Sequence, residues 1–110
     1  IRGLVIDGSC RDADDIQALG FPVYSRGFSP NGTVKETVGV TGIPIVCGGV
    51  PVHTGDMIIG GREGAVVIAK DDIEDVLEKA EAIAKKEVWV VEELKKGRTT
   101  AEIYQFEKIL

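Results

Sequence analysis

Histidine and cysteine are scarce in this sequence, and their scarcity excludes several kinds of site. His53 is the single histidine, which excludes a metal site made of several histidines and a Ser-His-Asp triad drawn from several histidines. We expect it in a surface turn. Cys10 and Cys47 form neither a CxxC pair nor a disulfide framework. We therefore expect reduced thiols in a cytoplasmic protein.

Long apolar runs and clustered basic residues are also missing. No apolar run approaches the ~20 residues that a membrane-spanning helix requires. A signal peptide is not expected, because a strand-like segment containing Asp7 begins almost at once. The net charge of −5, without a basic stripe, argues against direct binding of nucleic acid. No glycine pair is followed by the Lys-Ser or Lys-Thr of a P-loop. The 110 residues suit one globular domain with a modest core.

The segment at residues 5–12, Val-Ile-Asp-Gly-Ser-Cys-Arg-Asp, carries the strongest candidate site. Its apolar beginning predicts a strand over 4–6, and its Gly8-Ser9 pair predicts the turn that ends this strand. Its last residues predict the start of a helix at 12–16. An arginine and a carboxylate on adjacent residues at such a turn can face the same pocket.

Arg11 and Asp12, the last two residues of this segment, allow two interpretations. In a functional one, the planar guanidinium binds an anionic substrate and the carboxylate holds a hard divalent cation. In a structural one, Asp12 caps the helix with Asp15 completing an arrangement like a capping box. Arg11 then pairs with Asp7 or Asp14. The spacing alone leaves both interpretations open.

The rest of the first two thirds of the chain predicts short strands and glycine-rich turns. Strands are expected at 21–25 and 43–47, and Val50 and Val52 around Pro51 predict an edge strand or a bend. Strands at 57–59 and 65–69 are expected to form a hairpin around the loop 60–64. Residues 26–42 are rich in Gly, Ser, Pro and Thr, and they predict a loop with one irregular strand.

The last third of the chain predicts one long helix, capped by Asp71 or Asp72, running to Lys96 and ended by Gly97. Apolar residues recur along it in steps of four and three, at Ile73, Leu77, Ala80, Ala84, Val91 and Leu94. Glu87 occupies one position of this stripe. Because an unpaired buried carboxylate is costly, Glu87 either reaches water at the helix edge or meets a cation.

Two further features lie near the end of the chain. Residues 88–91 are apolar on every side of the helix, so we expect them to contact a second subunit as well as their own sheet. A final short helix is predicted over 100–109, with Thr99 or Thr100 as its cap.

Four ordered stretches resemble a known family. They are residues 5–12, Gly-Phe-Pro-Val-Tyr (20–24), Ile-Pro-Ile-Val-Cys-Gly-Gly-Val-Pro-Val-His-Thr-Gly-Asp (43–56) and Gly-Ala-Val-Val-Ile-Ala (64–69). They are similar to the family named for the regulator of ribonuclease activity A (RraA), which includes the 4-hydroxy-4-methyl-2-oxoglutarate aldolases and proteins once labelled demethylmenaquinone methyltransferases. The resemblance covers nearly the whole chain. It implies a single α/β domain over 1–110, of the swivelling β/β/α type, assembled as homotrimers or homohexamers.

The resemblance also implies a site and a reaction. Arg11 would bind substrate, Asp12 would bind Mg²⁺ or Mn²⁺, and Glu87 of a neighbouring subunit would support the metal through water. The implied activity is a divalent-metal-dependent lyase of the 4-hydroxy-4-methyl-2-oxoglutarate aldolase or oxaloacetate decarboxylase type. It cleaves a C–C bond of a 2-oxo acid to give pyruvate, while the metal and Arg11 stabilise the enolate.

Several departures from the family pattern leave other functions open. Only ten residues precede Arg11, which leaves no room for the loop that the family carries upstream, so we expect the C-terminal portion of a longer chain. Thr54 replaces the proline of the usual Pro-Gly-Asp, and Gly-Gly-Arg-Glu-Gly at 60–64 replaces Gly-Asp-x-Asp-Gly. The alternatives are a non-catalytic regulator that binds an RNase or helicase through its acidic surface, and an accessory domain of a fused enzyme.

Overall fold

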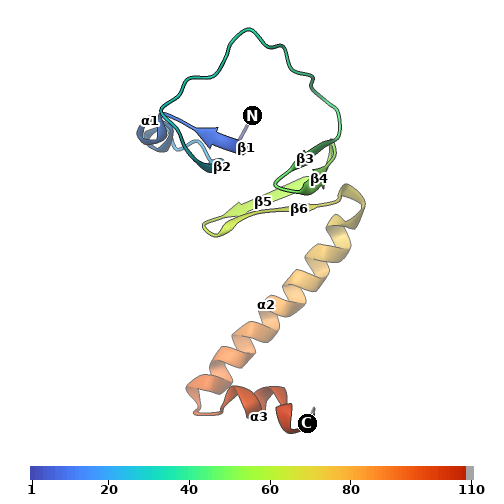
Figure 1. Ribbon diagram of the computed structural model, residues 1–110. Helices are drawn as coiled ribbons and strands as arrows, with labels where there is room; N and C mark the ends of the chain where they lie inside the picture. Colours follow the sequence, from blue (N-terminus) through green and yellow to red (C-terminus); the bar gives the residue numbers. More distant parts are fainter. Residues whose placement is uncertain (109–110) are drawn as a thin grey trace. The chain divides into compact units, whose positions relative to one another are not determined.

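The computed structural model describes residues 1–108, and the chain divides into two compact units, Ile1–Lys70 and Asp71–Leu110 (Figure 1). The first unit is built from strands and one short helix. The second is helical. The mixed α/β class, with strands in the first two thirds and a long C-terminal helix, is therefore as the sequence predicts.

The first unit begins with a β-α-β element. Its parts are β1 (Leu4–Cys10), α1 (Ala13–Ala18) and β2 (Val23–Phe28). The two strands form a parallel pair, as the helical crossover between them allows. The prediction that Gly8 and Ser9 end the first strand is wrong, because Ser9 pairs with Gly27 and Cys10 pairs with Phe28. The strand continues through these residues, and its register with β2 shifts between Ile6 and Ser9.

Two antiparallel hairpins follow in the same unit. The first joins β3 (Ile45–Cys47) to β4 (Val50–Val52), and the second joins β5 (Met57–Gly61) to β6 (Gly64–Ile68). Gly48 and Gly49 connect the first pair with φ values of 59° and 81°, the left-handed geometry that a two-residue hairpin turn requires. In the second hairpin the strands extend into the glycines, so the loop is shorter than predicted.

A close contact packs β2 against the second hairpin. A methyl group placed on Gly60 of β5 would lie 2.5 Å from the ring of Tyr24 in β2. Only a residue without a side chain allows the tyrosine ring to approach this closely, which explains the glycine inside the strand.

The segment 29–44 connects β2 to β3, and its described residues lie in neither helix nor strand. The predicted irregular strand is therefore absent here, while residues 26–28 of the predicted loop belong to β2. Val34, Val38 and Val40 in this segment are 77%, 95% and 75% exposed.

The second unit contains the long predicted helix, α2 (Ile73–Lys95), preceded by a 3-10 turn at Lys70–Asp72. Asp72 occupies the N-cap position but makes no capping hydrogen bond with its side chain among the described residues. Gly97, with φ of 90°, ends the helix as predicted, and its N–H donates to the carbonyl of Leu94 at 2.9 Å. Along the described part of the chain, no helix is long and apolar enough to cross a membrane.

A second, shorter helix, α3 (Thr100–Tyr104), contacts α2. Thr99 caps it as predicted. Its hydroxyl accepts from the Glu102 N–H at 3.3 Å, while the Glu102 carboxylate accepts from the Thr99 N–H at 2.8 Å. The helix ends earlier than predicted because Gln105 takes the left-handed conformation, with φ of 53°. A 3-10 turn follows at Phe106–Lys108, and the predicted helix end at Ile109 lies outside the described residues.

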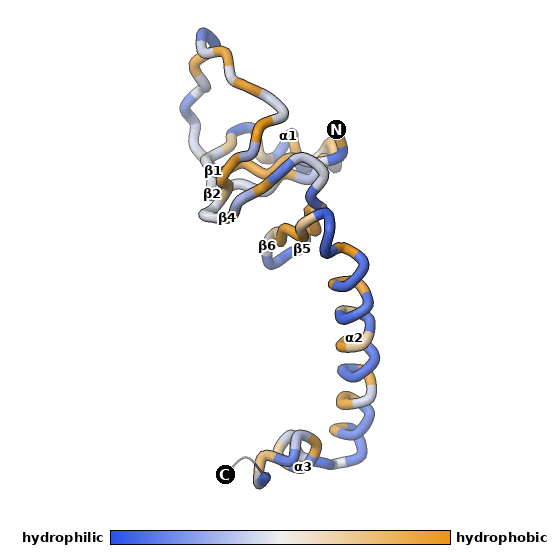
Figure 2. The backbone as a smooth tube through the Cα atoms, turned by 90° about the vertical axis from the view of Figure 1, so that its right-hand side faces the viewer, coloured by the Kyte–Doolittle hydropathy of each residue, from blue (hydrophilic) through white to orange (hydrophobic). Residues whose placement is uncertain are grey.

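Burial is unevenly distributed over the two units. Val90 of α2 and Ile103 of α3, each 8% exposed, are the buried apolar residues of the described chain. In the first unit, strand residues such as Val5 and Val66 remain 42% and 60% exposed, and Trp89 on α2 is 47% exposed. Figure 2 shows apolar residues on the strands and along α2, interspersed with polar ones.

Candidate active site

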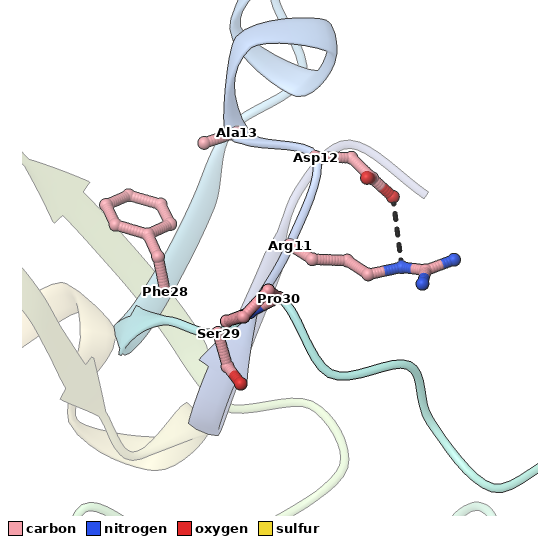
Figure 3. Close-up of a pocket in the computed structure, with 6 residues that line it drawn as sticks. All are labelled: Arg11, Asp12, Ala13, Phe28, Ser29 and Pro30. Carbon is pink, nitrogen blue, oxygen red and sulfur yellow. Dashed lines mark ion pairs between the residues drawn. The ribbon is translucent and has the colours of Figure 1, made fainter.

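The candidate site lies at the carboxyl ends of β1 and β2. Because these strands are parallel, their ends meet at the same edge, which is where α/β proteins commonly bind ligands. The Ser29 N–H donates to the Cys10 carbonyl at 2.9 Å and holds the two chain segments together beyond the last strand pair. An open hollow of about 420 Å³ is lined by Arg11, Asp12, Ala13, Phe28, Ser29 and Pro30 (Figure 3).

Arg11 and Asp12 form an ion pair with each other at the rim of this hollow. Arg11 Nε lies 3.2 Å from Asp12 Oδ2, and the two side chains are 54% and 61% exposed (Figure 3). The prediction that Arg11 pairs with Asp7 or Asp14 is therefore wrong. An exposed pair of this kind contributes only about 0.2–1 kcal/mol. A ligand carboxylate or a cation can therefore replace either partner at little cost.

The backbone of Asp12 separates the two interpretations of this residue. Asp12 stands at the N-cap of α1 with φ of 59° and ψ of 39°, the left-handed region. Its side chain makes no capping hydrogen bond within the described residues, so the predicted cap with Asp15 is wrong. Aspartate is one of the few non-glycine residues that adopt this conformation readily at single positions. The conformation leaves the carboxylate beside Arg11 instead of on the helix end.

The segment that follows β2 passes close to the guanidinium. A methyl group on Gly32 would lie 3.2 Å from Arg11 Nη1. The Asn31 N–H donates to the Ser29 hydroxyl at 3.3 Å and stabilises the turn that leads there. The position of Gly32 beside Arg11 was not predicted, although the Pro-Asn-Gly sequence directly after the strand indicates a turn there.

Asp7 of β1 forms a second charged group in this unit. Its carboxylate accepts from Arg26 Nε on β2 through Oδ1 and from the Gly48 N–H through Oδ2, the latter at 2.9 Å. The hydrogen bond from Arg26 and then that from Gly48 hold the pKa of Asp7 below its ordinary value. Arg26 was also missed from the sequence. Its signal is a charged residue in an otherwise apolar or small-residue strand.

The metal-binding capacity of this edge rests on one carboxylate. No group of three or more His, Cys, Asp or Glu side chains suited to a metal occurs in residues 1–108. Asp12 nevertheless supplies a hard oxygen ligand, and Mg²⁺ is commonly held by one or two carboxylates together with substrate oxygens and water. The residues present therefore fit a cation that is shared with a ligand. Glu87 lies on α2 and is exposed, and its contribution from a neighbouring copy stays a prediction.

The remaining candidates of the sequence have structural roles. His53 is 61% exposed in the turn between β4 and β5, as predicted. Asp56 accepts from the backbone N–H groups of His53 and Lys70, at 2.8 and 3.2 Å, and joins this turn to the end of β6. The thiol of Cys10 is free and lies 3.3 Å from the Ser25 hydroxyl.

Comparison with known proteins connects this geometry to a family. The family model described as RraA-like, Aldolase/RraA, matches residues 1–67. An uncharacterized protein of Methanocaldococcus jannaschii is 37% identical over 97% of this chain and 51% of its own length. A protein of Halalkalibacterium halodurans, named as a proposed 4-hydroxy-4-methyl-2-oxoglutarate aldolase, is 44% identical over 73% of this chain and 38% of its own.

A solved structure shows the same fold. The crystal structure of an uncharacterized protein from Pseudomonas syringae pv. tomato superposes with a TM-score of 0.82 and 29% sequence identity, over 90% of this chain and 50% of that one. The chain thus spans about half or less of the length of each of these relatives. The family match over 1–67 and the shared fold together show that this chain belongs to the RraA-like family.

Proposed function

We propose that the protein is a divalent-metal-dependent lyase that cleaves a C–C bond of a small 2-oxo acid to give pyruvate. The observation that carries this proposal is the conformation of Asp12. Its carboxylate is left beside Arg11 at the carboxyl edge of two parallel strands, and it does not serve as a helix cap. The names of the aldolase-like relatives support the same reaction class.

Arg11 is the residue that we assign to substrate binding and charge stabilisation. Its guanidinium can take a substrate carboxylate through two parallel N–H donors and so fix the 2-oxo acid in one orientation. In that position it lies close to the oxygen on which negative charge develops, and it offsets that charge. The exposure of the pair leaves the donors accessible from the hollow.

The bond changes follow from the substrate chemistry. In 4-hydroxy-4-methyl-2-oxoglutarate, the C4 hydroxyl loses its proton and becomes a carbonyl as the bond to C3 breaks. The electron pair of that bond passes to the pyruvate enolate, which takes up a proton. In oxaloacetate the bond between C3 and the carboxylate carbon C4 breaks, carbon dioxide leaves, and the electron pair stays on C3 as the pyruvate enolate. A divalent cation, when bound, would supply Lewis-acid stabilisation of this charge. Asp12 would hold it, with Glu87 of a neighbouring copy supporting it through water.

The proposed assembly is a homotrimer or homohexamer in the cytoplasm, with no direct contact to nucleic acid. The many exposed apolar strand residues of the first unit and the half-exposed Trp89 of α2 support self-association, because monomers rarely expose large contiguous apolar patches. Self-association would also bring the α2 of one copy to another, as the proposed role of Glu87 requires.

Pyruvate release by the full-length natural protein tests the activity. We would supply oxaloacetate and 4-hydroxy-4-methyl-2-oxoglutarate with Mg²⁺ or with EDTA, and compare Asp12→Ala with Asp15→Ala. Asp15 offers the matched control because it is an exposed carboxylate of α1 outside the hollow. We expect turnover that EDTA and Asp12→Ala abolish and Asp15→Ala retains. Absence of turnover with both substrates would contradict the proposal and favour a non-catalytic regulator.

A further inference from the structure

The pairing of β1 with β2 contains one irregularity, and it lies four residues before Arg11. Ile6 pairs with Ser25, and the next pair is Ser9 with Gly27. Two residues of β1, Asp7 and Gly8, therefore stand opposite the single residue Arg26 of β2. This arrangement is a β-bulge, a feature that is over-represented next to active sites and re-aims the side chains that follow it.

The side chain of Asp7 binds across this bulge and to the turn between β3 and β4. One carboxylate oxygen accepts from Arg26, which is the residue opposite the bulge. The other accepts from the N–H of Gly48 in the β3–β4 turn, 41 positions along the chain. Both oxygens of Asp7 therefore have partners, and the partners come from two different elements.

The position of the bulge has a direct consequence for Arg11 and Asp12. In a strand, a shift of one residue turns every following side chain to the opposite face. The chain that leaves the bulge is held again by the bond from the Ser29 N–H to the Cys10 carbonyl, and Arg11 comes directly afterwards. The direction of the Arg11–Asp12 pair thus depends on whether β1 accommodates its extra residue at Asp7 and Gly8 or at another place.

We propose that Asp7 and Arg26 are positioning residues, which hold the β1 bulge in place and thereby set the direction of Arg11 and Asp12 at the rim of the hollow. The structural part of this inference stands on the strand register and the Asp7 contacts. Its consequence for turnover rests on the proposed lyase function. Neither residue lines the hollow, so neither is assigned a contact with substrate.

The test compares Asp7→Asn, Arg26→Gln and the double variant in the full-length natural protein. Asp15→Asn and Arg62→Gln are matched controls, since they remove the same charges from exposed residues of α1 and of the β5–β6 loop. Amide resonances of Gly48, Ala13 and Ser29 report the structure, and kcat and KM with oxaloacetate and Mg²⁺ report the reaction. Circular dichroism checks that each variant is folded.

We expect Asp7→Asn to shift the Gly48 amide, which loses its carboxylate partner, and also the Ala13 and Ser29 amides at the hollow. We expect kcat/KM to fall about 10- to 100-fold, since a displacement of about 1 Å at a reacting group costs this much. The kcat/KM of the double variant should be no lower than that of the more impaired single variant, because both substitutions remove the same Asp7–Arg26 interaction. Arg26→Lys should recover part of the loss. The control variants should keep the wild-type amide shifts and activity.

Two results would overturn the inference. One is an Asp7→Asn protein whose Gly48 amide moves while the Ala13 and Ser29 amides and kcat/KM stay at wild-type values. The other is full additivity of the two single variants. If Asp7→Asn does not fold, Arg26→Gln decides the same question, because it leaves the Gly48 bond in place. If the wild-type protein turns over neither substrate, the lyase proposal fails, while the Ala13 and Ser29 shifts still decide the positioning role.

Discussion

Asp7 in the first unit and Glu93 in the second show two ways of holding a carboxylate. Each binds two donors, and in each case these hydrogen bonds keep the pKa below its ordinary value. Glu93 accepts from Lys96 and Arg98, which lie 3 and 5 positions away, at 2.7 and 2.8 Å. The partners of Asp7, Arg26 and Gly48, lie 19 and 41 positions away. The second unit is therefore organised by neighbours in sequence, whereas the site of the first unit depends on contacts between distant strands.

From this difference we expect substitutions at the site of the first unit to change turnover, and substitutions in the second unit to change stability. The substitution of Asp12 should have the largest effect. Asp12→Gly removes the carboxylate that we propose as a metal ligand, and glycine adopts the left-handed conformation without steric cost. We expect at least a 100-fold loss of metal-dependent kcat/KM, with a free energy of unfolding that is unchanged or up to about 1 kcal/mol higher. Turnover assays and urea unfolding on the same samples measure both. A stable variant with wild-type turnover would remove Asp12 from the site.

The next largest effect is expected in the second unit, on stability instead of turnover. Ile103→Ala removes one of the two buried apolar side chains among the described residues, and we expect a loss of about 2–5 kcal/mol in the free energy of unfolding. Ile83→Ala, at a position that is 57% exposed, serves as the control and should change this free energy little. Urea unfolding followed by circular dichroism at helical wavelengths gives both values. Equal losses would mean that Ile103 is not part of a packed contact.

A smaller loss should follow from removing the cap of α3. Thr99→Ala deletes the hydroxyl that accepts from the Glu102 N–H, and caps of this kind contribute about 1 kcal/mol. The same urea experiment measures it, and Thr100→Ala is a neighbouring control that leaves the cap in place. The amide resonances of Ser29 and Ala13 should not move. A shift of these two resonances would show that a change in the second unit alters the structure at the site.

The smallest effect is a pH dependence that distinguishes the two carboxylates. A lowered pKa in the folded state stabilises the protein above the unfolded pKa, and this stability is lost as pH falls through the folded value. The ordinary values are 3.8 for Asp7 and 4.5 for Glu93, and both folded values lie lower. On acidification below these ordinary values, the helical signal of α2 and the Gly48 amide shift should therefore both change. Glu93→Gln should flatten the change at α2 only, and loss of both changes in this variant would contradict the assignment.

The sequence predicted the parts of the molecule that short-range patterns determine. The long helix, its end at Gly97 and the Thr99 cap all follow from residues within a few positions of one another. The hairpin of β5 and β6 was also predicted. Arg11 and Asp12, which are adjacent in sequence, line one hollow, while their roles in binding stay predictions.

The features that were predicted wrongly depend on contacts that no local pattern encodes. Gly8 and Ser9 look like a turn in sequence, but pairing with β2 draws them into β1. Asp12 looks like a helix cap, but its left-handed backbone leaves its carboxylate next to Arg11. The bond from Asp7 to Gly48 joins segments 41 positions apart and becomes visible only when the strands are assembled.

Trp89 can serve as an intrinsic fluorescence probe, because its side chain is partly exposed. It is the single tryptophan of the chain, it is 47% exposed, and it lies on α2 two residues after Glu87. An indole in contact with water emits at longer wavelength than one enclosed by apolar side chains. If a second copy covers this part of α2, as we propose, the emission should move to shorter wavelength and iodide should quench it less. Dilution of the protein should reverse both changes, so intrinsic fluorescence alone can follow the joining of subunits.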